Sequence, residues 1–326
     1  MKKRLCLLLT CLSIICIDLR AIEINKMHFT INVNDNTATI MGGEPDVQGI
    51  LTIPEYVMYN KKNYMVTKIN EQAFSGNTRI EWINFPPSIE EVGTGAFDGC
   101  IELWGYSWPG NATRKIGAYA FRNCKKLQAF NFPDCLMTLG GHALEGCESL
   151  KVLIFGQDID EIPYQVCKDC TGLTEIVIFP GMLNKPKVIR DEAFAGCTSL
   201  SLVIIASDLK KIYGGAFAGC VNLTNISYQS YDPCEYDAKG AFESYHYEKV
   251  LLEIPKGTYQ TFKNTKYWNE FAAFKEVEPT GVKLPDATGS NKSMETFSVN
   301  GIREPQGSSG IRIIKNTEGK TIKVMK

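Results

Sequence analysis

Apolar residues recur in one fixed order through the middle of the chain, at intervals of 23 to 27 residues. Each copy has an Ala-Phe pair or its equivalent, a Cys or Asn three residues after the Phe position, and an apolar residue, usually Leu, three residues later. Further apolar residues follow three and five positions beyond this Leu, which predicts a short strand with one buried face. The copies end at Asn77, Cys100, Cys124, Cys147, Cys170, Cys197 and Cys220, with a degenerate eighth copy at Tyr245.

The period predicts a solenoid over residues 69–245. A unit of about two dozen residues cannot bury its own Leu, Ile and Phe side chains, so the units must stack, with neighbouring strands ~4.8 Å apart in a parallel sheet. The Phe of each Ala-Phe pair should fill the interior from the side opposite the strand, and one further apolar anchor precedes each next pair. The expected strands lie near 80–85, 103–108, 127–132, 150–155, 173–178, 200–205 and 223–228.

The repeats, written AF-x-G-C-x-x-L-x-x-I-x-x-P, resemble the BspA-type leucine-rich repeats of bacterial surface proteins. One copy continues as Leu173, Ile176, Ile178 and Pro180. The resemblance implies an α/β-type solenoid of leucine-rich repeats of about 23 residues, with short parallel strands joined by turns or short helices. It also implies adhesion to host proteins, to matrix or to other bacteria.

The N-terminus carries an export pattern. Basic residues 2–4 precede an apolar run over 5–17, and Ala21 is a candidate cleavage position, which together predict a signal peptide over residues 1–21. Cysteines within the run raise a lipid anchor as an alternative, although the residues before them are not the small ones that lipid attachment favours. The expected location is secreted, or on the outer surface of a Gram-negative bacterium.

Capping units are expected at both ends of the solenoid. Residues 22–68 contain four short alternating segments, HFTINV, TATIMG, GILTIP and YMVTKI, and should form an N-terminal β cap. Residues 246–277 should form the C-terminal cap, with a last strand from Val250 to Ile254. An aromatic helix should follow it, with Tyr259, Phe262, Trp268 and Phe271 on one side.

The C-terminal composition indicates a linker and a tail. Pro, Gly, Ser, Thr and Lys dominate residues 278–293, which is typical of a linker. Residues 294–326 contain three short alternating segments separated by Gly-containing turns, so we expect a β tail. The tail resembles the C-terminal sorting domains of the Bacteroidetes type IX export route, and a small β module or second cap is the alternative.

The charge balance excludes some partners. Removal of residues 1–21 takes a net three positive charges from the formal −1 of the full chain, which leaves −4. So mild a balance argues against nucleic acid and against an anionic membrane as the partner. Membrane contact is therefore expected only through an anchor.

Six of the twelve cysteines, together with one asparagine, occupy the same place in successive repeats. This ladder of positions comprises Asn77, Cys100, Cys124, Cys147, Cys170, Cys197 and Cys220. Stacked coils bring neighbouring ladder positions within the Cα separation that a disulfide permits. Equivalent side chains point in parallel rather than toward one another, however, and Asn77 occupies the same place. We therefore expect reduced, buried side chains that hydrogen-bond turn backbone groups.

Cys167 and Cys170 form a CxxC, which is compatible with a redox pair or half of a metal site. Cys167 replaces the Phe of its repeat and Cys170 is a ladder position, so packing accounts for both. The spacing of Cys135 and Cys234 leaves open whether they are free or paired.

No catalytic motif is found. The three histidines, His28, His142 and His246, fall in a cap, a turn and the degenerate repeat, and no GxSxG, HExxH, phosphate-binding loop or dinucleotide-binding glycine pattern occurs. We therefore expect no enzyme activity, no metal and no cofactor.

Two sets of residues are candidates for binding. The outward positions of the middle strands are apolar, and this outer stripe comprises Val152, Ile154, Val177, Leu202 and Ile204. An exposed apolar area marks an interaction site, but branched residues also suit strands that bind nothing. Trp82 and Trp104 form the second set, whereas the nearby Tyr106 and Trp108 occupy core positions.

The sequence thus predicts a non-catalytic binding or adhesion protein that uses its repeat surface. A protein partner, from host matrix or from another bacterial surface, is favoured over a glycan. The alternative is a glycan-binding surface protein of a nutrient-uptake system, which should show exposed aromatic residues with polar neighbours instead of an aliphatic stripe.

Overall fold

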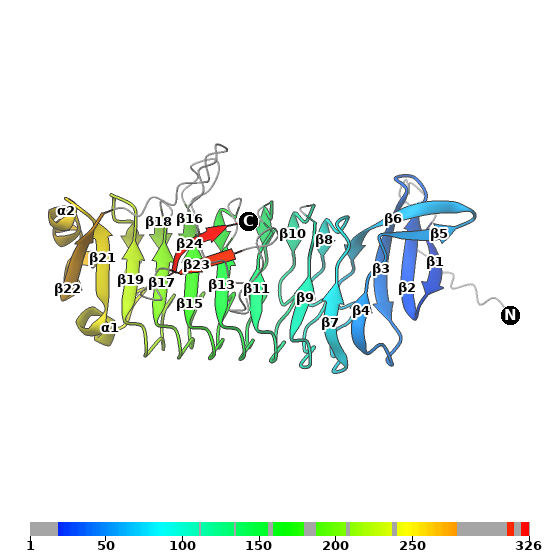
Figure 1. Cartoon of the computed structure of the whole chain (residues 1–326), viewed down its shortest axis with the longest axis horizontal. Helices are drawn as coiled ribbons and strands as arrows, with labels where there is room; N and C mark the ends of the chain where they lie inside the picture. The colour runs from blue at the N-terminus through cyan, green and yellow to red at the C-terminus, as the bar shows by residue number, and fades with distance from the viewer. Residues whose placement is uncertain are drawn as a thin grey trace, which may run out of the picture.

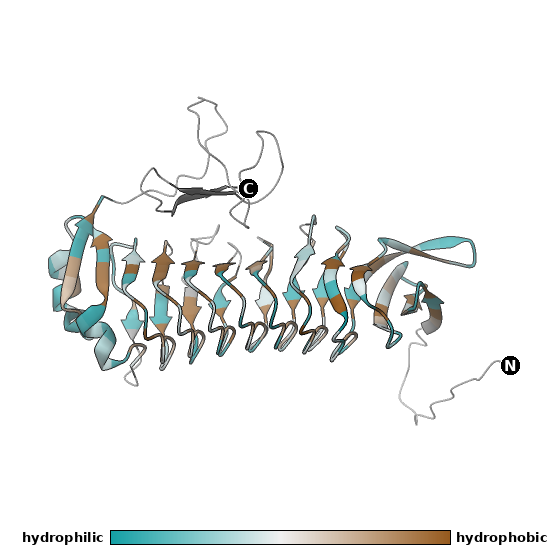
Figure 2. Cartoon of the chain, turned by 60° about the horizontal axis from the view of Figure 1, so that its bottom comes forward, coloured by the Kyte–Doolittle hydropathy of each residue, from teal (hydrophilic) through white to brown (hydrophobic). Residues whose placement is uncertain are grey.

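The chain folds into an elongated β-solenoid of about eight turns (Figure 1). The computed structural model describes residues 19–110, 112–133, 135–155, 159–178, 187–206, 209–236 and 240–278, and the backbone of 312–315 and 321–325. Each repeat forms one coil, and successive coils stack side by side along the long axis (Figures 1 and 2). The predicted leucine-rich-repeat solenoid is confirmed.

One strand per coil follows the repeat Leu or its equivalent, as predicted. These strands are β7 (Ile80–Asn84), β9 (Gly105–Ser107), β11 (Ala129–Asn131), β13 (Val152–Phe155), β15 (Glu175–Ile178), β17 (Leu202–Ile205) and β19 (Asn225–Tyr228). They form two parallel sheets, one in which β7 pairs with β9 and another that runs from β11 to β19. In the longer sheet Leu153, Ile176, Val203 and Ile226 are in register and form one inward-facing row. Most strands begin two residues later than predicted, because the Leu that starts the pattern lies in the preceding turn.

Each coil also contains a second strand, in most coils shorter than the first, that the sequence did not predict as a strand. These are β8 (Glu91–Val92), β10 (Lys115–Ile116), β12 (Thr138–Leu139), β14 (Glu161–Ile162), β16 (Lys187–Ile189), β18 (Leu209–Ile212) and β20 (Glu235–Tyr236). Most of the apolar anchors lie at their ends. The strands pair in parallel across the coils, in two sheets.

A third row of hydrogen bonds joins the coils at the Ala-Phe turns. The backbone N–H of each Phe position donates to the Ala carbonyl of the next coil, for example from Phe97 to Ala120 and from Phe121 to Ala143, both at 2.8 Å. The coil is therefore held to its neighbours on every side.

The Phe column fills the interior opposite the strands, as predicted. Phe97, Phe194 and Phe217 have no exposed surface and Phe121 has almost none. Two coils lack this Phe, since Leu144 and Cys167 take its place.

Phe132, which follows β11, and Phe155, at the end of β13, replace the missing rings. The aromatic contacts detour through Phe130, Phe132 and Phe155, with ring centroids 4.9 Å apart for Phe130–Phe132 and 5.3 Å for Phe132–Phe155. Phe155 then meets Phe194 edge to face at 6.0 Å. These rings therefore keep the core filled in the two coils that have Leu144 and Cys167 in place of Phe.

The N-terminal cap has six strands, of which four were expected. They are β1 (Leu19–Ile24), β2 (Met27–Asn32), β3 (Thr37–Gly43), β4 (Gly49–Thr52), β5 (Tyr56–Tyr59) and β6 (Lys62–Ile69). β1, β2 and β3 pair antiparallel. β3 then pairs with β6 in parallel, and the parallel pairing of the solenoid begins here. β1 begins inside the predicted signal peptide, most of which lies outside the described residues.

The C-terminal cap differs from the single expected helix. α1 (Ser244–Lys249) precedes β21 (Leu251–Pro255), and two short helical segments follow, α2 (Tyr259–Asn264) and the 3-10 turn Trp268–Glu270. β22 (Ala273–Val277) then adds a last parallel strand beside β21. The single predicted helix is wrong, because the chain leaves the helical conformation between the two segments, where Tyr267 has a φ of +70°.

The predicted linker lies outside the described residues, apart from Glu278. In the predicted tail, β23 (Arg312–Lys315) and β24 (Thr321–Met325) pair antiparallel. The third expected segment of the tail lies outside the described residues.

Candidate functional site

The outer stripe keeps its predicted register but not its predicted exposure. Ile154, Val177 and Ile204 face outward in directly paired positions of β13, β15 and β17. Ile154 and Val177 are only 5 % exposed, so the prediction of an open apolar patch is wrong at the centre of the stripe. Each of these two side chains lies between same-row residues of the coils before and after it.

The second row of the stripe is also interrupted. Val152 and Leu202 are partly exposed, but Glu175 lies between them in register. A carboxylate at this position separates the two apolar side chains. The stripe therefore offers no continuous apolar surface.

Trp82 and Trp104 do come together at the surface. Their ring centroids are 4.5 Å apart with the planes tilted by 51°, and Trp104 is 41 % exposed. Tyr106 and Trp108 instead pack against the core, and Phe85 stacks on Trp108 at 4.2 Å. The structure thus separates two surface tryptophans from two packing aromatic residues.

The orientation of Trp82 is fixed from two sides. Its indole N–H donates to Asn84 Oδ1 at 2.9 Å, and the Asn84 amide donates to Thr52 Oγ1 at 3.2 Å. The ring lies over Gly105, where an added Cβ would come within 2.4 Å of Trp82 Cζ3. Only glycine leaves room for the ring in this position.

The ladder cysteines hydrogen-bond the preceding coil. Each thiol donates to the carbonyl at the Phe position of the coil before it, as Cys124 does to Phe97 at 3.3 Å and Cys220 to Phe194 at 3.2 Å. The same carbonyl also accepts the turn N–H of its own coil, as Phe97 does from Cys100. The thiol thus occupies the second lone pair of a buried carbonyl.

Asn77 does the same for the first coil. Its amide donates to the Val47 carbonyl of the cap at 2.9 Å, and its side-chain oxygen accepts the N–H groups of Arg79 and Ile80. The polar side chain fits here because this position is only partly buried.

All nine described cysteines are buried thiols. Burial raises the pKa of Cys100 and of Cys220 to about 12, and it raises the pKa of Cys124 well above the usual range. Almost no thiolate exists at neutral pH under these conditions, and thiolate is the reactive form. These three ladder thiols are therefore unreactive in the folded chain. Burial also disfavours the thiolate of Cys170, but hydrogen bonds from the thiols of Cys147 and Cys167 lower its pKa.

The CxxC cysteines belong to the same packed interior. Cys170 hydrogen-bonds the Leu144 carbonyl at 3.1 Å, and its thiol also contacts those of Cys147 and Cys167. Burial raises the pKa of Cys167. Cys135 and Cys234 are both buried thiols. The Cys135 thiol donates to the Thr113 carbonyl, and the Cys234 carbonyl accepts the indole N–H of Trp268.

The histidines have structural partners. His142 bonds Glu145 at 2.8 Å and stacks on Tyr119. His246 is buried, accepts the Glu243 N–H at one ring nitrogen and lies 3.0 Å from the Cys220 carbonyl at the other. Burial lowers the pKa of His246, which keeps the ring neutral where the cysteine ladder ends.

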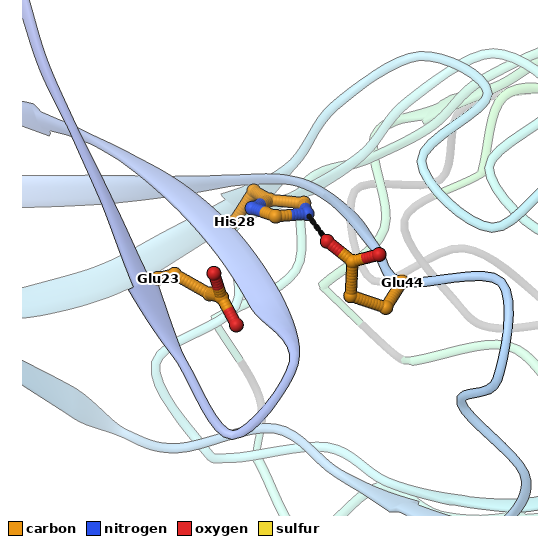
Figure 3. Close-up of side chains that lie close together, drawn as sticks. All are labelled: Glu23, His28 and Glu44. Carbon is orange, nitrogen blue, oxygen red and sulfur yellow. Dashed lines mark ion pairs between the residues drawn. The ribbon is translucent and has the colours of Figure 1, made fainter. Parts of the chain in front are cut away.

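His28 lies in the cap between two glutamates, as Figure 3 shows. Its Nε2 is 2.9 Å from Glu44 Oε1, and Glu23 faces it across the strand pair. The three side chains could supply ligand atoms within 4.8 Å of one another. The three side chains are exposed or half-exposed, and His28 and Glu44 already contact each other as partners.

A shallow cleft of about 460 Å³ lies along one edge of the coils. Three of its charged residues are held in ion pairs, Arg190 with Glu161 at 2.7 Å and Glu192 with Lys168 at 2.8 Å.

The sequence did not single out the hairpin of β5 and β6. In Figures 1 and 2 this hairpin extends beyond the N-terminal end of the solenoid. Tyr56, Met58 and Met65 face outward from it and are 47 %, 67 % and 37 % exposed. The continuous apolar run at 56–59 could have identified this exposed patch, because a two-stranded hairpin buries only one of its two faces and leaves every second apolar residue exposed.

The chain belongs to the BspA-type leucine-rich repeat family, whose model matches six copies over residues 59–174 and 175–279. Proteins of this class are generally non-catalytic binding scaffolds.

The chain is similar to several solved structures, and the first of those described below shares its fold. A leucine-rich repeat protein from T. pallidum is 22 % identical with a TM-score of 0.54, over 63 % of this chain and 91 % of that one. One from Bacteroides ovatus is 18 % identical with a TM-score of 0.44, over 78 % and 76 %. One from Eubacterium ventriosum is 25 % identical with a TM-score of 0.46, over 53 % and 46 %. A search of curated proteins gave no match.

Among the described residues, none of the helices has the length and apolar character that a membrane crossing requires.

Proposed function

We propose that this chain is a non-catalytic binding protein of the bacterial surface that contacts a protein partner. Membership of the BspA-type family supports a binding role, and the export pattern of residues 1–21 supports a location outside the cytoplasm.

The observation that carries the proposal is the distribution of exposed apolar side chains. Six of the eleven large exposed ones among the described residues lie between Met41 and Trp104, at the N-terminal end. Three of them, Tyr56, Met58 and Met65, share the outward face of the β5–β6 hairpin and form the hairpin patch. Methionine adapts its shape to a partner, and apolar surface of this kind marks contact sites.

The turn of the hairpin adds positive charge to the patch. Lys61 and Lys62 lie at the tip, and Lys62 also covers the ring of Tyr64 at 5.6 Å. The surface therefore fits a partner protein with an apolar area bordered by acidic groups, which favours encounter as well as contact.

A catalytic role has no support from the charged groups. Glu161, Arg190 and Glu192 of the cleft are held in ion pairs, and His246 is held in the fold by the Cys220 carbonyl. The proposal therefore keeps the prediction of a non-enzyme.

The test uses two matched methionines. Met58→Glu lies in the hairpin patch and Met137→Glu lies in the solenoid, and both side chains are 67 % exposed. Both variants should keep the melting temperature, because exposed substitutions change stability by ~0.5 kcal/mol or less. Binding of the full chain to immobilised collagen, fibronectin, laminin and fibrinogen is measured by surface plasmon resonance.

We expect at least one of these proteins to bind, and Met58→Glu to weaken it about tenfold or more while Met137→Glu leaves it unchanged. Equal binding by the wild type and Met58→Glu would exclude the hairpin patch. Absence of binding to every protein would contradict the adhesion role.

A further inference from the structure

The outer face of β4, β7 and β9 carries two parallel rows of side chains. Figure 1 places these three strands side by side next to the cap. Ile50, Trp82 and Gly105 are in register across the strands, and so are Thr52, Asn84 and Ser107. Trp104 precedes Gly105 and lies against Trp82. The face thus has an apolar row of Ile50, Trp82 and Trp104 and a polar row of Thr52, Asn84 and Ser107.

The two rows differ in chemistry but not in charge. The apolar row is open to solvent, with Ile50 67 % and Trp104 41 % exposed. The polar row offers two hydroxyls and an amide, and none of the six residues is charged. A surface with flat rings on one side and neutral hydrogen-bonding groups on the other is amphipathic across the strands.

The indole of Trp82 is held rigidly in this face. Its N–H is already satisfied by Asn84 at 2.9 Å, and Asn84 is in turn bonded to Thr52. The ring lies on Gly105, so it cannot turn inward. What Trp82 offers to a ligand is therefore ring surface, and its orientation is set before any ligand arrives.

We propose that this face binds a neutral hexose polysaccharide whose chain runs across β4, β7 and β9. A pyranose has an apolar C–H side and a rim of hydroxyls, which match the apolar row and the polar row. Neighbouring strands lie ~4.8 Å apart, about the length of one hexose unit, so successive sugars meet successive strands. Ring faces and a few placed polar groups are how proteins hold small neutral molecules.

Other occupants match the face less well. The absence of charge from both rows disfavours an acidic glycan or a charged peptide. A protein contact would gain from continuous apolar area, but the polar row and Gly105 break that area. This site deepens the proposed binding role and is separate in residues from the hairpin patch, so each can fail without the other.

The experiment measures polysaccharide binding by the full chain. Soluble β-glucan and mannan are titrated, with polygalacturonate as the acidic comparison, and binding is followed by isothermal calorimetry and tryptophan fluorescence. Trp268 has no exposed surface, so a ligand on this face should change the emission of the surface pair. We expect at least one neutral polysaccharide to bind and polygalacturonate not to bind.

Three variants test the residues. Trp104→Ala should weaken binding about tenfold or more, and Trp104→Phe should restore part of it. Gly105→Ala keeps both tryptophans but displaces the Trp82 ring, and should also weaken binding. Tyr164→Ala, at a 48 % exposed aromatic residue elsewhere on the solenoid, is the control and should change nothing.

The outcomes separate cleanly. No binding of any neutral polysaccharide, or unchanged binding by folded Trp104→Ala, would overturn the assignment. Loss of protein binding by Trp104→Ala without polysaccharide binding would make the pair a protein contact and would also overturn it. Met58→Glu should leave polysaccharide binding intact, whichever way the protein-binding test ends.

Discussion

Replacement of Cys147 by Ala tests what the cysteine ladder contributes. The thiol has no exposed surface and donates to the Phe121 carbonyl at 3.3 Å. That carbonyl already accepts the Cys124 backbone N–H, so the variant leaves one of its two lone pairs without a partner. It also removes a sulfur atom from the interior between two coils.

The expected cost follows from these two losses. A void the size of a methyl group costs ~1 kcal/mol, and loss of a hydrogen bond with a partner left buried costs ~1 kcal/mol more. The turn bond from Cys124 keeps the carbonyl partly satisfied, which limits the second loss. We expect the free energy of unfolding to fall by about 1–3 kcal/mol.

Urea unfolding followed by circular dichroism measures this change from the midpoint at constant slope. The control is Glu148→Ala in the same turn, whose carboxylate pairs with Lys125 at 2.8 Å in an exposed position. It should change stability by ~0.5 kcal/mol or less. Thiol titration of the denatured wild type should find at least six free groups.

Two results would refute this account of the ladder. If Cys147→Ala were as mild as the Glu148 control, the thiol would contribute neither packing nor a hydrogen bond. If three or more disulfides formed among the ladder cysteines, the parallel orientation of the side chains would be wrong.

Two further predictions concern the core and pH. Phe155→Ala should lower the free energy of unfolding by about 3–5 kcal/mol, because this ring fills the space that Cys167 leaves beside Phe194; a loss below ~1 kcal/mol in urea melts would show that the detour of rings is unimportant. Because burial lowers the pKa of His246 below its ordinary 6.5, unfolded chains bind the extra proton more readily, so stability should fall as pH drops below about 6.5. His246→Gln, which stays neutral, should have a melting temperature that depends less on pH between 7 and 5, and an identical pH dependence would contradict this.

The repeats by themselves determined the coil and its core. Leu at each strand start and Phe opposite it specify which side chains go inside, because a unit of this size can bury them only by stacking. The strand positions and the parallel stacking followed from that spacing. The ladder positions were also visible in sequence, since their spacing locks them to the same turn of every coil.

The tertiary structure decided how the surface is exposed. Period-2 alternation shows which residues face outward, but it does not show that Ile154 and Val177 are nearly covered in the folded chain. It also decided what replaces Phe at Leu144 and Cys167, since Phe132 and Phe155 reach that space from another part of the coil.

The candidate binding surfaces were also predicted only in part from the sequence. Sequence identified Trp82 and Trp104 as aromatic residues in adjacent repeats, but the rows they form with Ile50 and Thr52 depend on pairing between the cap and the first coils. The strand β22 was invisible for the same reason, because AFKEV has no alternation of its own and is a strand only beside β21. Local pattern fixes which face of a strand is buried, whereas exposure and neighbours depend on residues distant in the sequence.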